Sequence, residues 1–283
     1  MPSWTLLGQA LISGLLAGGL YSLLGLGLSL SWGLLRLVDL SHFALAVLSA
    51  YVAYQLGTVH HLPVGLALVL VVPGAFAFGV GLHWIFKKFA VGEFGSLLVT
   101  FSIAVLIETL IQWLWTADFR RYETPLASAS IPVGPLFVPV LELIAFATAA
   151  VLAGLTWLWL TRSYVGKALR ACAEDPSMAA AFGVHQQRLS FALSGLCSAF
   201  AAVAGIFVAL ISTLAPSQIW SWLGVIFAVV IIGRLGNPIG LLIASMAIGA
   251  AEGLAMAVFS PAWAPMVSFS ILSVVLLWQP KWL

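Results

Sequence analysis

Charge is scarce in this sequence. Only 7% of its 283 residues are Asp, Glu, Lys or Arg, whereas 63% are hydrophobic, and the formal net charge at pH 7 is +2. A water-soluble domain needs far more polar surface than this composition supplies. The short loops hold the few basic residues, and no basic patch outside them offers a surface for nucleic acid. The composition therefore excludes a water-soluble domain, and we expect no nucleic-acid partner.

The motifs of common catalytic and metal sites are also missing. The sequence has no HExxH, no GxSxG and no phosphate-binding loop, because its one Gly-Lys pair, Gly166 and Lys167, is followed by Ala168. Its two cysteines, Cys172 and Cys197, have neither metal nor redox spacing, and we expect both to be reduced. We therefore expect no catalytic, cofactor-binding or metal-binding residues. This chain is not expected to be an enzyme or to hydrolyse ATP by itself.

Long apolar runs, by contrast, are abundant. They recur along the chain, and each is long enough to cross the ~30 Å hydrocarbon core of a bilayer. No Lys or Arg precedes Arg36, although a cleaved signal peptide would need one, so we expect the first span to remain. The predicted fold class is all-α: a polytopic membrane helix bundle of eight or nine transmembrane helices, forming one domain over residues 1–283. The expected spans cover residues 5–31, 40–56, 63–86, 95–116, 140–160, 189–214, two parts of 222–259, and 265–278.

The number and orientation of the spans depend on two features. Residues 222–259 are too long for one crossing and contain GRLGNPIG, which predicts a short span, a tight turn at Gly233 and a second span; a re-entrant segment is the alternative. Nine Lys and Arg residues fall in loops on one side, and only Arg120 and Arg121 fall on the other, in a long loop over residues 117–139. Cytoplasmic loops are enriched in Lys and Arg, so the side with nine basic residues is expected to be cytoplasmic. With nine crossings, this orientation places the N-terminus outside and the C-terminus inside.

Residues 161–188, called the polar segment below, are the longest non-apolar run in the chain. They hold four of the eleven basic residues. Asp175 followed by Pro176 predicts a helix start, because an Asp oxygen accepts a free N–H and Pro is tolerated at the first helical position. Gly183 suits a left-handed stop. The polar segment therefore predicts a helical extension, a break and a short second helix.

Three acidic residues lie inside apolar spans: Glu108, Glu142 and Glu252. An ionisable group at that depth costs at least ~2.5 kcal/mol unless it is paired or hydrated, so such residues are functional candidates. The alternative for Glu252 is a protonated acid bonded to a backbone carbonyl, and for Glu142 a position near the outer interface. His42, close to Asp39, is interpreted either as a gate or docking contact, or as an interfacial side chain that reaches water.

Small residues recur at helical spacing in two spans. Gly14 lies four residues before Gly18, and Gly249 lies four residues before Gly253. Membrane helices approach closely at such positions. We expect these glycines to pack helices within one bundle, with a dimer interface as the alternative.

The polar segment and three other stretches resemble the permease subunits of branched-chain amino acid ABC importers. The coupling segment of that family and the span after it are similar to GKALRACAEDPSMAAAFGVHQQRLSFALSGLCSAFAAVAG. Its first span and the following turn resemble GLYSLLGLGLSLSWGLLRLVDLSH, its glycine turn and Glu-containing span resemble VIIGRLGNPIGLLIASMAIGAAEGL, and its last span resembles VSFSILSVVLLWQPKWL. The chain departs from the family where Asn-Phe-Ala-His-Gly is replaced by residues 39–43, and where Gly-Gly-x-Gly-Ser is replaced by residues 233–237.

The resemblance implies a permease subunit of an ATP-driven importer in the bacterial inner membrane. Its substrates would be branched-chain amino acids or related small amino acids and amides. Its partners would be a second permease subunit, cytoplasmic ATP-binding subunits, an extracytoplasmic substrate-binding protein and membrane lipid. An ATP-independent secondary transporter or channel is the alternative, with the buried Glu residues as ion sites. The polar segment, which such a carrier does not need, favours the importer.

The resemblance and the residues together imply two sets of site residues. One set belongs to a cytoplasmic coupling helix that ATP-binding subunits would hold, and the other belongs to a translocation path or its gate. The coupling set is Ala171, Glu174, Asp175, Pro176, Met178, Ala179, Ala180 and Gly183. The path or gate set is His42, Asp39, Glu252, Gly233 and Gly236.

Overall fold

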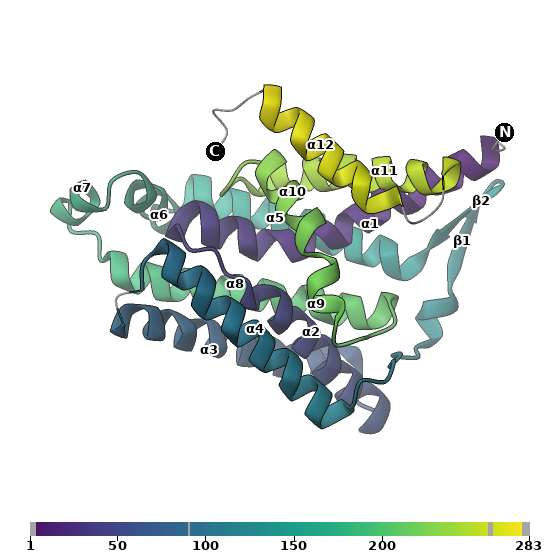
Figure 1. Ribbon diagram of the computed structural model, residues 1–283, viewed down its shortest axis with the longest axis horizontal. Helices are drawn as coiled ribbons and strands as arrows, with labels where there is room; N and C mark the ends of the chain where they lie inside the picture. The colour runs from purple at the N-terminus through teal and green to yellow at the C-terminus, as the bar shows by residue number, and fades with distance from the viewer. Residues whose placement is uncertain (1–3, 90, 260–262, 279–283) are drawn as a thin grey trace.

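Helices make up most of the protein (Figure 1). The structure is a computed structural model that describes residues 4–89, 91–259 and 263–278. The longer helices are α1 (Trp4–Leu30), α2 (Ser41–Tyr54), α3 (Val64–Lys88), α4 (Glu93–Trp115), α5 (Val140–Arg162), α8 (Gln186–Ile211), α11 (Pro238–Val258) and α12 (Ala264–Trp278). The shorter ones are α6 (Tyr164–Glu174), α7 (Pro176–Ala181), α9 (Gln218–Ser221) and α10 (Leu223–Ile232), with the helical turns η1 (Ser31–Leu35), η2 (Gln55–Val59) and η3 (Pro125–Ser128).

Seven of the described helices are long and apolar enough to cross a membrane. They begin at residues 4, 41, 64, 94, 140, 186 and 238. Two shorter apolar segments, Gln218–Ile232 and Met266–Val275, occupy the positions of the remaining expected spans. The prediction of a polytopic, all-helical membrane bundle is therefore confirmed.

The loops gather at two opposite ends of the bundle (Figure 1). One end carries α6 and α7, and Arg36 reaches it from the end of α1, where its Nη2 donates a hydrogen bond to the Ala173 carbonyl at 3.0 Å. We call it the basic end. The other end carries the N-terminus and a β-hairpin, and we call it the hairpin end. Arg120 lies at the hairpin end, where its backbone pairs with Leu214, which follows α8.

The segment formed by α9 and α10 runs from the hairpin end to the basic end in two pieces. It follows Leu214, and it ends in a turn where the Gly236 N–H donates to the Ser29 carbonyl, near the basic end of α1, at 3.0 Å. The predicted turn after Gly233 is therefore confirmed, and α11 returns toward the hairpin end. Irregular backbone inside the hydrocarbon region of a membrane is stable only where protein or a hydrated cavity surrounds it.

The orientation of the two ends in the membrane can be tested by cysteine labelling. A cysteine at Ser177, in α7, should react with an impermeant maleimide only after the membrane is opened, whereas a cysteine at Arg121 should react in intact cells, because the Lys and Arg distribution places the basic end inside. Wild-type protein gives the background from Cys172 and Cys197, which are buried. Labelling at position 177 in intact cells would contradict this orientation. Lys281, the ninth basic residue of the expected inner set, lies outside the described residues.

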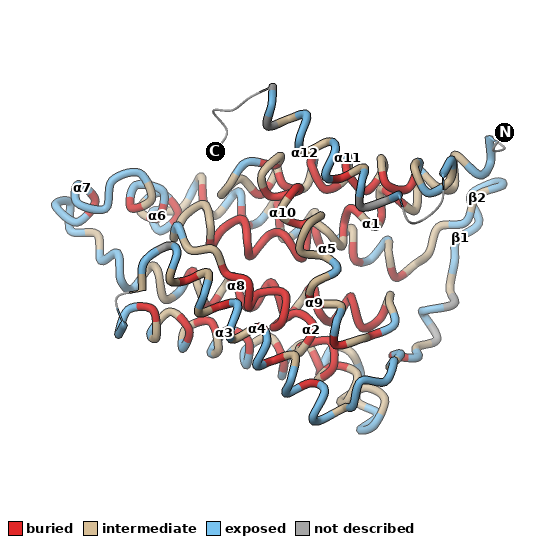
Figure 2. The backbone as a smooth tube through the Cα atoms, viewed as in Figure 1, coloured by how far each residue is buried: buried red, intermediate tan, exposed pale blue. Residues whose placement is uncertain are grey.

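Helix α1 forms the centre of the bundle, and the buried residues concentrate along it and along α8 (Figure 2). It packs most extensively against α11. A Cβ atom on Gly18 would lie 2.8 Å from the Met246 Cα, and one on Gly253 would lie 3.0 Å from the Gly14 Cα. These glycines therefore pack two helices of one chain against each other, which confirms the packing interpretation.

The loop over residues 117–139 has more structure than expected. Strand β1 (Ser130–Val133) pairs antiparallel with β2 (Leu136–Pro139). Gly134, with φ +61°, occupies the first central position of the two-residue turn, where a type II′ turn requires glycine. Pro132 and Pro139 concealed the strands in the sequence, since proline is accepted only at the edge or start of a strand.

Candidate functional site

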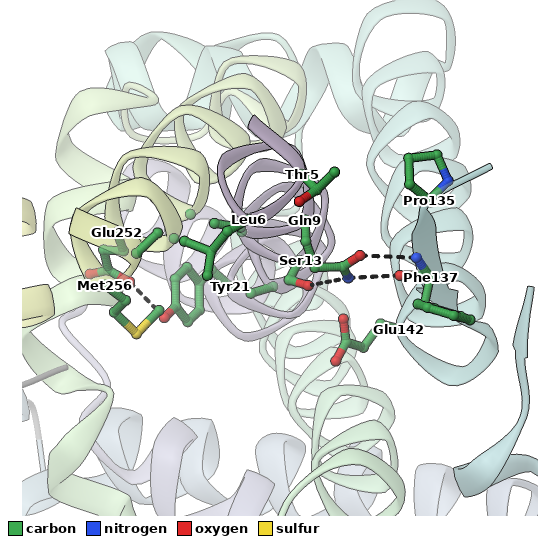
Figure 3. Close-up of a pocket in the computed structure, with 16 residues that line it drawn as sticks. Thr5, Leu6, Gln9, Ser13, Tyr21, Pro135, Phe137, Glu142, Glu252 and Met256 are labelled. Atoms are coloured by element: carbon green, nitrogen blue, oxygen red, sulfur yellow. Dashed lines mark hydrogen bonds between the residues drawn. The ribbon is translucent and has the colours of Figure 1, made fainter. Parts of the chain in front are cut away.

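A cavity of about 910 Å³ lies at the hairpin end, between α1, α5, α11 and the turn of the hairpin (Figure 3). We call it the large cavity. Its wall is mixed: apolar and small side chains come mainly from α1 and α11, and polar side chains come from α1, α5 and α11. The lining residues are Thr5, Leu6, Gln9, Ala10, Ser13, Gly14, Ala17, Tyr21, Pro135, Phe137, Glu142, Gly249, Glu252, Gly253, Met256 and Ala257. Such a combination of apolar wall and few polar groups is typical of a small-molecule site.

Glu252 is the most buried acid in this wall, with 5% of its surface exposed. The Tyr21 hydroxyl donates a hydrogen bond to its Oε2 at 2.8 Å, and the Ser268 hydroxyl donates to Oε1. The close approach of α11 to α1 at Gly14 brings Tyr21 within reach of the carboxyl group. The pairing satisfies both carboxyl oxygens, and the backbone-carbonyl alternative is not what the structure shows.

A second, smaller cavity of about 240 Å³ is also lined by the Tyr21 and Glu252 pair. Both residues also line the large cavity. The remaining lining residues of the small cavity are Trp220, Ser221, Trp222, Gly224, Val225 and Phe269. The break between α9 and α10 thus meets the same pair, and discontinuous helices of this kind form substrate sites in many transporters.

Glu142 lies in the first turn of α5 and lines the large cavity. In Figure 3 its carboxyl group lies on the cavity side of α5, below Ser13. Its Oε2 is buried and has no hydrogen-bond partner in the described part of the chain. A carboxylate is favoured at a helix N-terminus, so the position is electrostatically reasonable for a charged group. Glu142 is therefore a wall residue of a cavity, and its unused oxygen is available to a ligand donor.

Gln9 fastens the hairpin to α1 at the mouth of the large cavity (Figure 3). Its Nε2 donates to the Phe137 carbonyl at 2.7 Å, and its Oε1 accepts from the Phe137 N–H at 2.9 Å. The side-chain amide thus makes the same pair of hydrogen bonds that a neighbouring strand would make. Pro135 and Phe137 from the hairpin are held against the cavity in this way.

Replacing Gln9 by alanine should loosen the hairpin. Both bonds to Phe137 are lost, so the amides of β2 should exchange with deuterium several times faster in purified protein, while α1 itself stays protected. The matched control is Gln112→Ala, since Gln112 is an exposed amide on α4 whose Nε2 donates to Glu108 in its own helix. Unchanged exchange at β2 in the Gln9→Ala protein would show that the hairpin is held by other contacts.

Glu108, the third acidic residue of the apolar spans, does not line either cavity. It is half-buried on α4, and its Oε2 accepts a hydrogen bond from the Trp220 Nε1 at 2.9 Å. Because Trp220 lines the small cavity, this bond ties α4 to the broken segment beside the Tyr21 and Glu252 pair. The structure therefore supports a positioning contact for Glu108.

His42 and Asp39 are buried and line neither cavity. The His42 Nε2 lies 2.9 Å from the Leu24 carbonyl, and only 2% of the residue is exposed. Asp39 accepts from the Ser41 hydroxyl at 2.5 Å. The interpretation of His42 as an interfacial side chain reaching water was therefore wrong. Gly27 lies against the imidazole ring of His42. Because glycine has no side chain, this position leaves room for the buried ring.

Gly233 and Gly236 form the turn between α10 and α11. A Cβ on Gly233 would lie 2.5 Å from the Leu241 Cα, and Gly236 has φ +74°. Arg234 replaces a Gly of the permease family that the sequence resembles, and it also adopts a left-handed conformation, with φ +68°. The turn is fastened to α1 through the Gly236 N–H, which lies 3.2 Å from the Ser29 Oγ. Close packing thus explains why glycine is needed at position 233, and the positive φ explains it at position 236.

The polar segment folds as predicted, as helix α6, a break, and helix α7. The Asp175 Oδ1 accepts from the N–H groups of Ser177 and Met178 at 2.9 and 3.0 Å, and Gly183, with φ +79°, follows the end of α7. Hydrogen bonds from the Ser177 side chain and the Met178 backbone lower the pKa of Asp175, so its capping carboxylate stays charged at neutral pH. The short helix is confirmed; its coupling role stays a prediction.

The outer face of α7 is available to a partner. Ala179 packs inward, whereas Met178 and Phe182 expose 57% and 82% of their surface at the tip of the segment. Figure 1 shows α7 standing away from the spans at the basic end. The remaining residues of the predicted coupling set, Ala171, Glu174, Pro176 and Ala180, are exposed as well.

Comparison with known proteins gives one family and a consistent set of relatives. A family model described as the permease component of the branched-chain amino acid transport system matches residues 10–276. The high-affinity branched-chain amino acid transport system permease protein BraD of Pseudomonas aeruginosa is 25% identical, over 96% of this chain and 94% of that protein. The permease proteins LivH of Salmonella typhimurium and Escherichia coli are 22% and 23% identical, each over 96% of this chain and 93% of the relative. No solved structure matches the chain.

Proposed function

The chain belongs to the family of branched-chain amino acid transport system permease components, and from this premise we propose that it imports branched-chain amino acids with energy from separate ATP-binding subunits. It is a multi-pass protein of the bacterial inner membrane and a membrane-spanning permease subunit of an importer. Related small amino acids and amides fall within the same substrate class. The proposal treats residues 1–283 as a single permease domain that performs no catalysis of its own.

The observation that carries the proposal is α7. A short, capped helix with exposed Met178 and Phe182 projects beyond the ends of the spans at the basic end (Figure 1). A permease that moves its cargo without partners has no use for such a projection. We assign α7, with the adjoining end of α6, as the element that a cytoplasmic ATP-binding subunit grips. ATP would change the populations of inward-open and outward-open states because the two states contact the ATP-binding subunit differently.

The large cavity is the proposed entry to the translocation path. Glu142 and Glu252 offer acceptors to the ammonium group of an amino acid, and Ser13 offers a hydroxyl to its carboxylate. Leu6 and Met256 supply apolar surface for a branched side chain. The Tyr21 and Glu252 pair lines both this cavity and the small one, and we propose that it acts as a gate between them.

The other proposed partners follow from the two ends of the bundle. An extracytoplasmic binding protein would deliver substrate at the hairpin end, next to the mouth of the large cavity. A second permease subunit would complete the path. His42 and Asp39 would support the basic end of the path from within the bundle, and Gly233 and Gly236 would hold the turn of α10 and α11 against α1.

The proposal is tested by reconstitution. The permease is placed in proteoliposomes with its partner permease, ATP-binding subunits enclosed with ATP, and the binding protein loaded with labelled leucine outside. Uptake should require every component and should stop when ATP is replaced by a non-hydrolysable analogue. Leucine uptake by the permease without ATP-binding subunits would instead establish the ATP-independent carrier. Uptake of a short amide but not of leucine would reassign the substrate and keep the mechanism.

A further inference from the structure

A third cavity, of about 450 Å³, lies at the basic end and takes no part in the proposed path. We call it the basic-end cavity. It is enclosed by the end of α1 with η1, by the last turn of α3, by α6 and by the first turn of α8. Its lining residues are Leu34, Leu35, Arg36, Leu37, His83, Phe86, Lys87, Val91, Leu169, Cys172, Pro176, Gln186, Gln187, Leu189 and Ser190.

The polar part of this wall has one sign of charge. Arg36 and Lys87 are its basic residues, and no Asp or Glu is among the described residues that line it. The structure shows no ion pair between Arg36 or Lys87 and a carboxylate among the side chains that it describes; the ion pair of Arg120 and Asp118 lies at the opposite end. Arg36 and Lys87 are both exposed, so solvent screens each charge, but two basic side chains on one wall of a partly apolar cavity still favour an anion over a cation.

Arg36 is held in place by the fold. Arg36 has φ +55°, an uncommon conformation for a residue with a side chain, and its guanidinium group is fixed by one hydrogen bond to the Ala173 carbonyl. A guanidinium group has five N–H donors, so that bond leaves donors for a ligand. Lys87 reaches the cavity from the last turn of α3.

Neutral donors complete the wall. The His83 ring packs edge-on against Phe191, with centroids 4.9 Å apart, and its buried Nδ1 has no hydrogen-bond partner in the described chain. Gln186 and Gln187 line the cavity from the first turn of α8, a helix of 26 residues whose N-terminal dipole favours an anion. An unpartnered buried ring nitrogen in the same cavity wall as two basic residues is a polar group that a ligand would satisfy.

We propose that the basic-end cavity binds a phosphate-type anion, either the headgroup of an anionic lipid or a free phosphate. Basic pockets between membrane helices on the cytoplasmic side are typical sites for anionic lipid headgroups. The ligand would contact Arg36 and Lys87 together, and so would join the end of α1 to the end of α3. Because Cys172 and Pro176 also line the cavity, a bound anion would steady the junction of α6 and α7.

Lys87 and Lys88 form a matched pair for testing this site. Lys87 lines the cavity, whereas the Lys88 ammonium group lies over the Trp84 ring, 4.8 Å from its centroid, and is absent from the lining. The full-length protein in neutral detergent is titrated with short-chain phosphatidylglycerol, with inorganic phosphate, and with short-chain phosphatidylcholine as the zwitterionic control. The melting temperature reports binding.

Wild type and Lys88→Gln should be stabilised equally, and Lys87→Gln should bind about fivefold more weakly, as expected for one basic residue at an anionic headgroup. Stabilisation by phosphatidylglycerol alone identifies a lipid site, and stabilisation by inorganic phosphate identifies a free-anion site. If Lys87→Gln melts below wild type before any ligand is added, His83→Phe replaces it, because phenylalanine keeps the contact with Phe191 and removes the ring nitrogen. Equal responses from the Lys87 and Lys88 variants, or no response from wild type, would overturn the proposal.

Discussion

Replacing Ala180 by proline should abolish substrate uptake while leaving the permease in the membrane. Ala180 lies inside α7, where proline removes a backbone N–H and clashes with the carbonyl one turn earlier, at a cost of ~3 kcal/mol or more. A six-residue helix is not stable enough by itself to offset that cost, because short helices are marginal without tertiary support. Each 1.4 kcal/mol is tenfold in an equilibrium, so the helical form of α7 should become about a hundredfold rarer.

Two measurements distinguish loss of coupling from loss of folding. The first is the ATPase activity of the assembled complex with and without loaded binding protein, and the second is the amount of permease in washed membranes. Loaded binding protein should stimulate the wild-type complex and fail to stimulate the Ala180→Pro complex, at equal membrane levels, because the spans are unchanged.

Ala180→Ser is the matched control for this experiment. Ala180 is exposed, and serine at the same site keeps the backbone N–H and adds a single hydroxyl group. Its stimulation and uptake should stay close to wild type. Normal transport by the Ala180→Pro complex would remove α7 as the coupling element, and the assignment of the importer mechanism would lose its main support.

The local features of α7 were predictable because each depends on neighbouring residues. Asp175 and Pro176 begin the helix through contacts within three residues, and Gly183 ends it through its own φ angle. The glycine pairs of α1 and α11 were also predictable in kind, since close approach in membranes needs small residues whichever helix is the partner. Local sequence features of this kind predict where a helix begins and ends and whether it packs closely against another helix.

The partners of the buried groups were not predictable in the same way. Tyr21 and Glu252 are 231 positions apart, and Ser268 belongs to a different helix from both. Periodicity gives the buried face of a helix but not which helix faces it, so the sequence did not identify Tyr21 as a partner of Glu252. The burial of His42 was missed for the same reason. The room for its ring is left by Gly27, which lies on another helix.

Replacing Glu252 by lysine should produce the second large effect, a loss of both stability and uptake. The side chain is 5% exposed, and its two oxygens accept from Tyr21 and Ser268, so lysine loses both bonds and leaves an ammonium group without an acceptor. A basic residue at the centre of a membrane helix costs roughly 2.5–3.5 kcal/mol. Most of the protein should therefore aggregate when extracted in mild detergent, and leucine uptake should fall to background.

Two variants separate the site from the charge change. Glu252→Gln keeps an oxygen that accepts from Tyr21 and adds no charge, so it should extract as a single species and lose much less uptake than the lysine variant. Glu123→Lys makes the same change at an exposed side chain in the loop of the hairpin end and should resemble wild type in both measurements. If Glu252→Lys were as stable and as active as Glu123→Lys, then Glu252 could not be a buried, hydrogen-bonded wall of the large cavity, and the gate formed with Tyr21 would have to be abandoned.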